Sequence, residues 1–122
     1  MLFARRLFLV AAGYGFLALV PQYFLLDRNG QDSPPAINHP EYYFGFIGVA
    51  LAWQIGFVII ARDPVRYRRF MLPAIGEKVL FGIPAMILFA LGRLGIPMFA
   101  AGAVDLLLGL LFAVAYIRTP TQ

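Results

Sequence analysis

The chain has 122 residues, of which 61% are hydrophobic and only 13% charged, and its formal net charge is +4. A soluble domain of this size needs a polar surface that so few charged residues can hardly cover, which favours an integral membrane protein. The absence of cysteine excludes disulfides, thiolate metal sites and dithiol redox chemistry, and the basic residues cluster beside apolar segments, where lipid headgroups rather than nucleic acid are the nearer partner.

Four apolar stretches are each long enough to cross the hydrocarbon core of a bilayer, which takes roughly 20 residues. They cover residues 7–26, 42–61, 73–92 and 97–117. We therefore predict an all-α membrane protein, a four-transmembrane-helix bundle that forms a single domain over residues 1–122. Glu77 and Lys78 interrupt the third stretch near its start, and we expect both to snorkel toward the headgroups.

The first stretch follows Arg5 and Arg6, a pair that resembles the core of a twin-arginine export signal. No small-x-small cleavage site follows the pair, and the apolar run continues past the length of a signal peptide. We therefore interpret this stretch as an uncleaved membrane anchor whose two arginines set its orientation.

The first and last connections between the spans differ in length and composition. Residues 27–41 contain Gly30, Asn38 and three prolines, Pro34, Pro35 and Pro40, which predicts an irregular external loop. His39 and Glu41 in this loop are the types of residue that bind metals, but His39 is the only histidine, so we predict no metal site and no cofactor. Residues 93–97 form only a tight turn, which makes the last two spans antiparallel neighbours.

The middle connection is basic and contains Asp63 followed by Pro64, a good helix N-cap with proline at the first helical position. We predict a short basic amphipathic segment there, lying at the headgroups between the second and third spans. Eight of the ten basic residues fall on the same side of the membrane as this connection, and only Arg28 and Arg93 fall on the other. The positive-inside rule then gives an N-in/C-in protein with both termini in the cytoplasm, and we expect it in the bacterial inner membrane.

Small residues recur at helical spacing in the spans, and such stripes mark helix contacts in a membrane. We expect Gly15, Gly82 and Gly109 to lie at those contacts. Trp53 lies too deep for an interfacial aromatic belt, so it and Gln54 are expected to pack against protein or to line a pocket. Gln54 also points away from a stripe of small residues in its own span, which offers a contact for a homodimer. That stripe comprises Gly45, Gly48, Ala52 and Gly56.

Polar residues inside the spans are the candidates for function, because a carboxylate at the centre of a membrane helix costs about 2.5 to 3.5 kcal/mol. We place Asp105 at the centre of a pocket in the outer half of the bilayer, with Gln22, Arg93 and Tyr43. There it serves either as a protonatable group that meets a ligand or as an ion-pair partner of Arg93. A second candidate is a cytoplasmic cluster that binds anionic headgroups. This cluster comprises Arg62, Arg66, Arg68, Arg69, Glu77 and Lys78.

The residue patterns specify no reaction, because the only serine and the only histidine both lie in the first connection and no glycine-rich phosphate loop is present. We therefore expect an accessory or binding protein that holds a hydrophobic ligand or docks to a larger membrane complex. One alternative is a proton-coupled transporter that acts as a dimer, similar in size to the small multidrug resistance proteins, whose essential glutamate in the first span has no counterpart here. The other is a lipid-modifying enzyme, similar in span count to the small DoxX-like membrane proteins.

The predicted orientation can be tested with single cysteines, because the chain has none of its own. Ser33→Cys should react with an impermeant thiol reagent from outside the cell, and Val65→Cys should react only from the cytoplasm, since the basic flanks orient the spans. Labelling of Ser33→Cys from the cytoplasmic side alone would refute the orientation.

Overall fold

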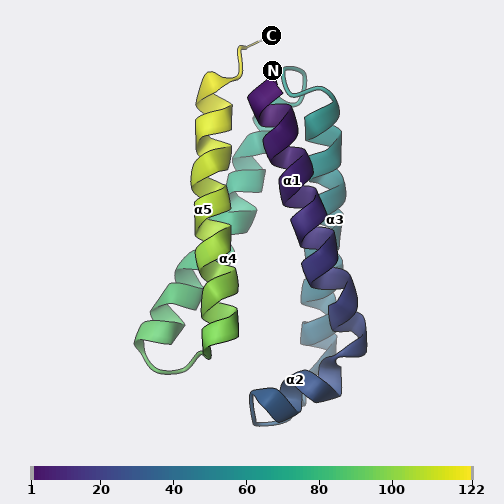
Figure 1. Ribbon diagram of the computed structural model, residues 1–122, viewed down its shortest axis with the longest axis vertical. Helices are drawn as coiled ribbons and strands as arrows, with labels where there is room; N and C mark the ends of the chain where they lie inside the picture. Colours follow the sequence, from purple (N-terminus) through teal and green to yellow (C-terminus); the bar gives the residue numbers. More distant parts are fainter. Residues whose placement is uncertain (1, 122) are drawn as a thin grey trace.

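A computed structural model describes residues 2–121 of the chain, and within that range every regular element is a helix. Four of the helices are long, one is short, and two turns of 3-10 helix extend the long ones (Figure 1). In chain order the elements are α1 (Leu2–Leu19), η1 (Val20–Phe24), α2 (Leu26–Asp32), α3 (Pro40–Arg62), η2 (Arg68–Phe70), α4 (Met71–Ala90) and α5 (Ile96–Arg118).

The prediction of four helices long and apolar enough to cross a bilayer is confirmed in the described part of the chain. Each has 23 residues, which gives a length of roughly 34 Å at 1.5 Å per residue. The third span begins at Arg68 rather than at residue 73, because η2 continues directly into α4. This earlier start moves Glu77 and Lys78 from the end of the span to its middle.

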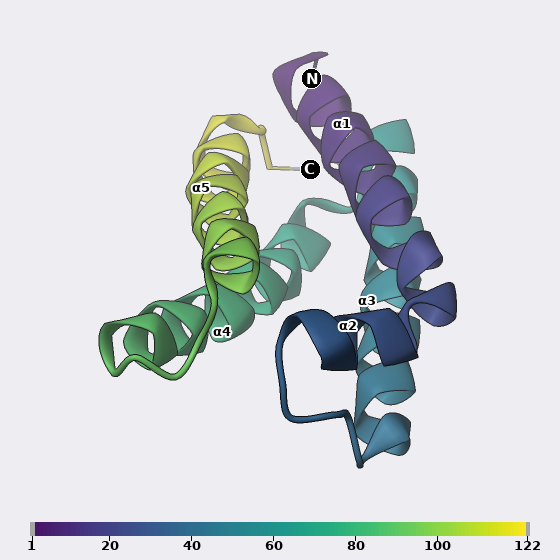
Figure 2. The same cartoon turned by 60° about the horizontal axis from the view of Figure 1, so that its bottom comes forward.

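The four long helices form two hairpins rather than one evenly packed bundle. Helix α1 packs along α3, and α4 packs along α5, whereas contacts between the two pairs are far fewer. Both chain termini lie at one end of the molecule, here called the terminal end, and the hairpins meet there (Figure 1). They diverge toward the opposite end, and Figure 2 shows the same separation after a rotation of 60°.

Three phenylalanine rings join the hairpins in the half of the molecule nearer the terminal end. Phe8 of α1, Phe57 of α3 and Phe112 of α5 are fully buried. The rings of Phe8 and Phe112 stack with their centroids 4.2 Å apart, and Phe57 meets Phe112 edge-on at 5.1 Å. Such aromatic pairs contribute about 0.5 to 1.5 kcal/mol each beyond the energy of burying their surface, so this cluster stabilises the contact between the hairpins.

At the terminal end, Arg68 ties the start of the third span to the end of the fourth. Its Nε donates hydrogen bonds to the carbonyl oxygens of Tyr116 at 3.0 Å and Thr119 at 2.8 Å. Its guanidinium also lies 3.8 Å from the centroid of the Tyr116 ring. A cation near the last carbonyl groups of a helix is favourable for the helix dipole, so Arg68 caps α5.

The middle connection forms less helix than the sequence suggests. The carboxylate of Asp63 accepts a hydrogen bond from the backbone N–H of Arg66 at 3.3 Å, as expected of an N-cap. No helix forms between α3 and η2: residues 64–67 are a turn in which the backbone N–H of Tyr67 donates to the carbonyl oxygen of Asp63 at 3.0 Å. The connection is therefore a capped turn followed by a 3-10 turn.

The first connection was expected to be irregular, but its first half is the short helix α2 at the end opposite the termini (Figure 1). The amide of Asn29 donates to Gln22 Oε1 and to the hydroxyl of Tyr43, both at 2.8 Å. The Tyr43 hydroxyl in turn donates to the backbone oxygen of Gln22 at 2.7 Å. These bonds dock α2 on the ends of α1 and α3, and they join residues too far apart in sequence for local composition to reveal them.

The expectation that Gly15, Gly82 and Gly109 lie at helix contacts is confirmed. A Cβ atom on Gly15 would overlap the side chain of Gln54, and one on Gly82 would lie 2.6 Å from Leu106 Cγ. A Cβ on Gly109 would lie 3.3 Å from the Cβ of Lys78. The first contact lets α1 approach α3, and the other two let α4 approach α5.

Gly15→Leu should lower the free energy of unfolding by about 1 to 3 kcal/mol, because the new side chain overpacks against Gln54. Gly13→Leu is the matched control on the same helix, since a Cβ there would have no described atom within 4 Å. The control should change stability by less than about 0.5 kcal/mol. Titration with a denaturing detergent, followed by helical circular dichroism, measures both. Equal losses would show that the contact with Gln54 is not the cause.

Candidate functional site

Every candidate span carries a polar side chain near its own middle. Tyr14, Lys78 and Asp105 lie within two residues of the centre of their 23-residue spans, and Gln54 lies within three. This depth is the most costly one for ionised groups. A cluster of polar residues that four helices bring to one depth is therefore the strongest candidate for a site.

The centre of the cluster is the ammonium group of Lys78, which is only 3% exposed. Its Nζ lies 3.5 Å from Asp105 Oδ1 on the neighbouring helix α5 and 3.5 Å from Glu77 Oε2 on its own helix. It also lies 5.3 Å from the centroid of the Phe57 ring, which provides a favourable face for a cation. Lys78 thus links α4 to α5 and lies against the aromatic cluster that joins the hairpins.

The two carboxylates are less enclosed than the lysine between them. The side chain of Glu77 is 17% exposed and that of Asp105 is 15% exposed. Although Glu77 Oε2 is within ion-pair distance of Lys78, this buried atom accepts no hydrogen bond from residues 2–121. With all three groups ionised, the cluster carries one negative charge in excess.

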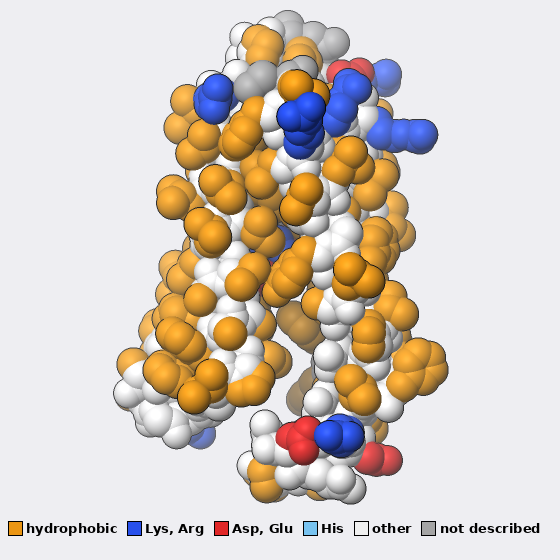
Figure 3. Space-filling model, viewed as in Figure 1, with side chains coloured by type: hydrophobic (Ala, Val, Ile, Leu, Met, Phe, Trp, Pro, Cys, Tyr) orange, Lys and Arg blue, Asp and Glu red, His pale blue; other side chains and the backbone are white. Residues whose placement is uncertain are grey.

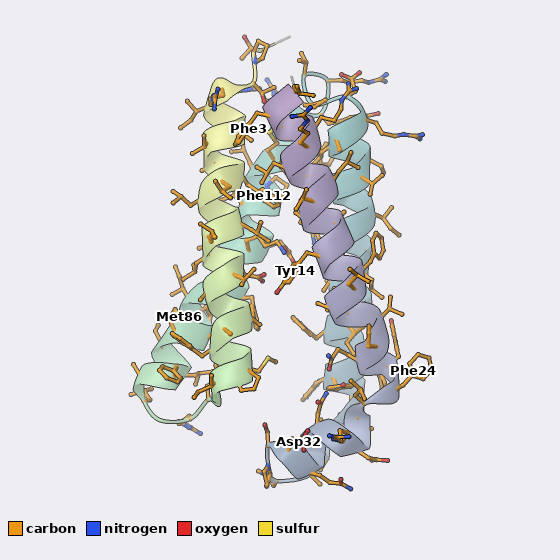
Figure 4. All side chains as sticks on the ribbon, in the orientation of Figure 1. Phe3, Tyr14, Phe24, Asp32, Met86 and Phe112 are labelled. Carbon is orange, nitrogen blue, oxygen red and sulfur yellow. The ribbon has the colours of Figure 1, made fainter. Side chains whose placement is uncertain are left out.

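Tyr14 approaches the cluster from the other hairpin. It points from α1 into the space between α1 and α5 (Figure 4) and is partly exposed. The space-filling view shows that this space widens into an open gap between the hairpins toward the end opposite the termini (Figure 3). Tyr14 lies within electrostatic reach of Asp105, so a group from α1 lies near the cluster formed by α4 and α5.

A groove of about 370 Å³ runs between α3 and α4 beside the cluster. Its walls are almost entirely apolar, and the two carboxylates of the cluster supply its ionisable groups. Helix α3 contributes Phe46, Val49, Ala50 and Trp53, helix α4 contributes Pro73, Gly76, Glu77, Leu80 and Phe81, and α5 contributes Asp105. Lys78 does not line the groove, so a molecule in it would meet the carboxylates rather than the ammonium group.

The pocket predicted around Asp105 has different partners from those expected. Among the described residues, Asp105 pairs with Lys78 and makes no ion pair with Arg93, which lies in the turn between α4 and α5. Gln22 and Tyr43 bond to each other and to Asn29 at the end opposite the termini. Lys78 replaces Arg93 as the partner of Asp105 because the third span begins earlier than predicted. Lys78 therefore lies near the middle of its span, as Asp105 does, whereas Arg93 lies beyond the end of the third span.

The predicted basic cluster is also divided. Arg62, Arg66 and Arg69 are exposed at the terminal end, where basic side chains gather (Figure 3). Arg68 is partly buried in its contact with the end of α5. Glu77 and Lys78 lie in the interior of the molecule, where Lys78 Nζ is 3.5 Å from Asp105 Oδ1.

Trp53 and Gln54 face different neighbours although they are adjacent in sequence. Trp53 lines the groove between α3 and α4. Gln54 is 1% exposed and lies against Gly15 of α1, where its amide nitrogen donates to the carbonyl oxygen of Ala50 at 2.8 Å. The small-residue stripe of α3 lies on the surface of the single chain, with Gly45 and Ala52 exposed and Gly48 and Gly56 half-buried.

No protein-family model, no curated protein and no solved structure matches this chain. Residues 2–121 also contain no group of three or more His, Cys, Asp or Glu side chains arranged to hold a metal ion. The function of the site must therefore be inferred from its own geometry.

Lys78→Met should destabilise the protein by about 3 to 5 kcal/mol, because it leaves two carboxylates in the membrane interior without their counterion. Arg93→Gln is the control, since Arg93 is an exposed turn residue and its loss should cost less than about 0.5 kcal/mol. Detergent unfolding followed by circular dichroism compares the two. A larger loss from Arg93→Gln than from Lys78→Met would contradict the ion-pair assignment.

Proposed function

We propose that the protein is a membrane-embedded binding protein that holds a small hydrophobic molecule with a polar group in the groove between α3 and α4. The observation that carries this proposal is the position of Glu77 and Asp105. Both are ionisable groups near mid-membrane, and both line a groove whose other walls are apolar. The apolar walls suit the body of the ligand, and the carboxylates suit its polar group.

The size and composition of the groove support this function. Its volume of about 370 Å³ lies within the range of roughly 300 to 1,000 Å³ that is typical of small-molecule sites. Such sites combine hydrophobic and aromatic walls with a few polar groups that fix the orientation of the ligand. An acyl chain of the bilayer alone would need no carboxylate, and two carboxylates are costly to retain at this depth.

We propose the same orientation that the basic residues predict. The terminal end faces the cytoplasm of a bacterial inner membrane, where Arg62, Arg66 and Arg69 bind anionic headgroups. The concentration of basic side chains at this end supports that orientation (Figure 3). The groove and the ion cluster then lie at the middle of the bilayer.

A proton-coupled transporter is the second candidate, and the gap between the hairpins favours it. The cluster lies beside the groove on one side, and Tyr14 faces the widening gap on the other (Figures 3 and 4). A transporter that exchanges a ligand for a proton needs a protonatable group that can be reached from two sides, here from the groove and from the gap. A homodimer through Gly45, Gly48, Ala52 and Gly56 would place two such sites in one particle.

Trp53 makes the binding proposal directly testable, because it is the only tryptophan in the chain and lines the groove. Bromododecanol, an alcohol whose bromine quenches indole fluorescence, should quench Trp53 saturably in neutral phosphatidylcholine nanodiscs. Gly76→Leu should weaken this quenching about tenfold, since Gly76 lines the groove and a side chain there would occupy it.

Gly13→Leu is again the matched control, because it adds the same side chain to an exposed position of α1 outside the groove. It should leave the quenching curve unchanged. If Gly76→Leu and the unmodified protein are quenched alike, the fluorescence reports lipid around the helix and the groove is not a binding site.

A further inference from the structure

We propose that the ligand of the groove is a cation, an amine or quaternary ammonium group on an apolar body, and that it binds in exchange for a proton of the Glu77–Lys78–Asp105 cluster. This inference rests on the proposed binding function and names the chemical class of the ligand. Three observations support it: the excess negative charge of the cluster, the position of the carboxylates rather than the lysine in the wall of the groove, and the aromatic rings that line the same groove.

The charge of the cluster is unbalanced. Lys78 Nζ lies 3.5 Å from both carboxylates but carries a single positive charge, and neither carboxylate has another positive partner among residues 2–121 within ion-pair distance. Since an isolated charge at the middle of a bilayer is costly, one of the two carboxylates requires either a proton or a cation from outside the chain. The same site therefore accepts one or the other.

The position of the lysine excludes an anionic ligand from the groove. Lys78 is 3% exposed and does not line the groove, whereas Glu77 and Asp105 both do. An anion would approach two carboxylates before it reached the ammonium group, and like charges at that distance repel each other. A cation would meet favourable charges first.

Aromatic rings along the groove provide further contacts for a cation. Phe46, Trp53 and Phe81 line the groove together with the carboxylates, and the ring centroids of Phe46 on α3 and Phe81 on α4 are 5.6 Å apart. The faces of such rings attract quaternary ammonium groups, most strongly for tryptophan. The protein already uses this interaction on the far side of the cluster, where Lys78 lies over Phe57.

The exchange balances without any further reactant. When the cation enters, a proton leaves the carboxyl group of Glu77 or Asp105 and passes to water, and no covalent bond between heavy atoms changes. The other charged or ionisable groups that face these carboxylates are Lys78 on α4 and Tyr14 on α1. Helix α3 has ionisable residues only near its two ends and adds none at this depth. Binding of the cation should therefore strengthen as pH rises.

The test compares two probes that differ only in charge, bromododecyltrimethylammonium and bromododecanol, by quenching of Trp53 in neutral phosphatidylcholine nanodiscs. The ammonium probe keeps its charge at every pH, so any pH dependence of its binding comes from the protein. We expect it to bind at least about tenfold more tightly than the alcohol. Its affinity should rise by up to about tenfold per pH unit while a proton competes, and binding should release one proton to a weakly buffered indicator.

Variants of the cluster test the charge directly. Glu77→Gln or Asp105→Asn removes the excess negative charge, so each should abolish the preference for the ammonium probe while leaving the alcohol bound. The double variant Lys78→Gln with Asp105→Asn keeps Glu77 as a single carboxylate and restores the excess charge, so it should regain the preference. A purely structural ion pair would give no such recovery. If a variant does not fold, proton release on binding of the ammonium probe to the unmodified protein still tests whether the cation replaces a proton.

Two results would overturn the inference, and they are distinguishable. If both probes bind equally and Gly76→Leu weakens both, the groove binds ligands but does not select a cation. If neither probe gives quenching that depends on Gly76, the binding function itself is wrong. Preference for the ammonium probe together with proton release and recovery in the double variant supports both proposals.

Discussion

An ammonium group at the middle of a lipid bilayer needs acceptors around it, and the arrangement of this protein follows from how Lys78 obtains them. Its neighbour in sequence, Glu77, supplies one carboxylate, and Asp105 supplies another from α5. The second contact requires α4 and α5 to approach closely. Glycines at Gly102 and Gly109 lie about one turn to either side of Asp105, and each leaves room for side chains of α4. These small residues therefore allow α4 and α5 to come close enough for Lys78 to pair with Asp105.

The same interaction explains why the molecule is firm at one end and open at the other. Lys78 lies over Phe57, which belongs to the aromatic cluster between the hairpins, and Arg68 caps α5 nearer the termini. All these contacts lie at the middle or toward the terminal end, whereas the opposite end is held within one hairpin by Gln22 and Tyr43. The groove lies between α3 and α4, where the rings of Phe46 and Phe81 also meet, and the gap between the hairpins widens toward the end opposite the termini (Figure 3). A ligand can therefore reach the carboxylates without breaking the ion pair.

Much of the fold could be predicted from sequence, because a bilayer makes span length and hydropathy decisive. The glycines at helix contacts also follow from spacing alone, as Gly15 and Gly109 show. The partner of Asp105 could not be predicted this way. Glu77 and Lys78 are adjacent in sequence, so they look like an ion pair near a membrane surface. The predicted third span began five residues too late, which placed both residues near its end and supported that interpretation.

Side-chain partners distant in sequence account for the other differences. Helix α2 forms because Asn29 bonds to Gln22 and Tyr43, and Arg68 leaves the basic segment because α5 ends beside it. Neither contact has a periodic signal, so only the arrangement of the helices reveals it. Membrane spans can be predicted from one chain segment at a time, whereas a polar site depends on the relative depth of several.

A second carboxylate distinguishes this cluster from a simple clamp between α4 and α5. Lys78 and Asp105 alone would hold the two helices together and leave no net charge in the membrane. Glu77 adds a charge that the clamp does not need, and its Oε2 accepts no hydrogen bond from the described residues. Glu77 also lines the groove, so a molecule bound there would lie beside this residue. The cost of keeping it at this depth is understandable if binding, rather than stability, is what it provides.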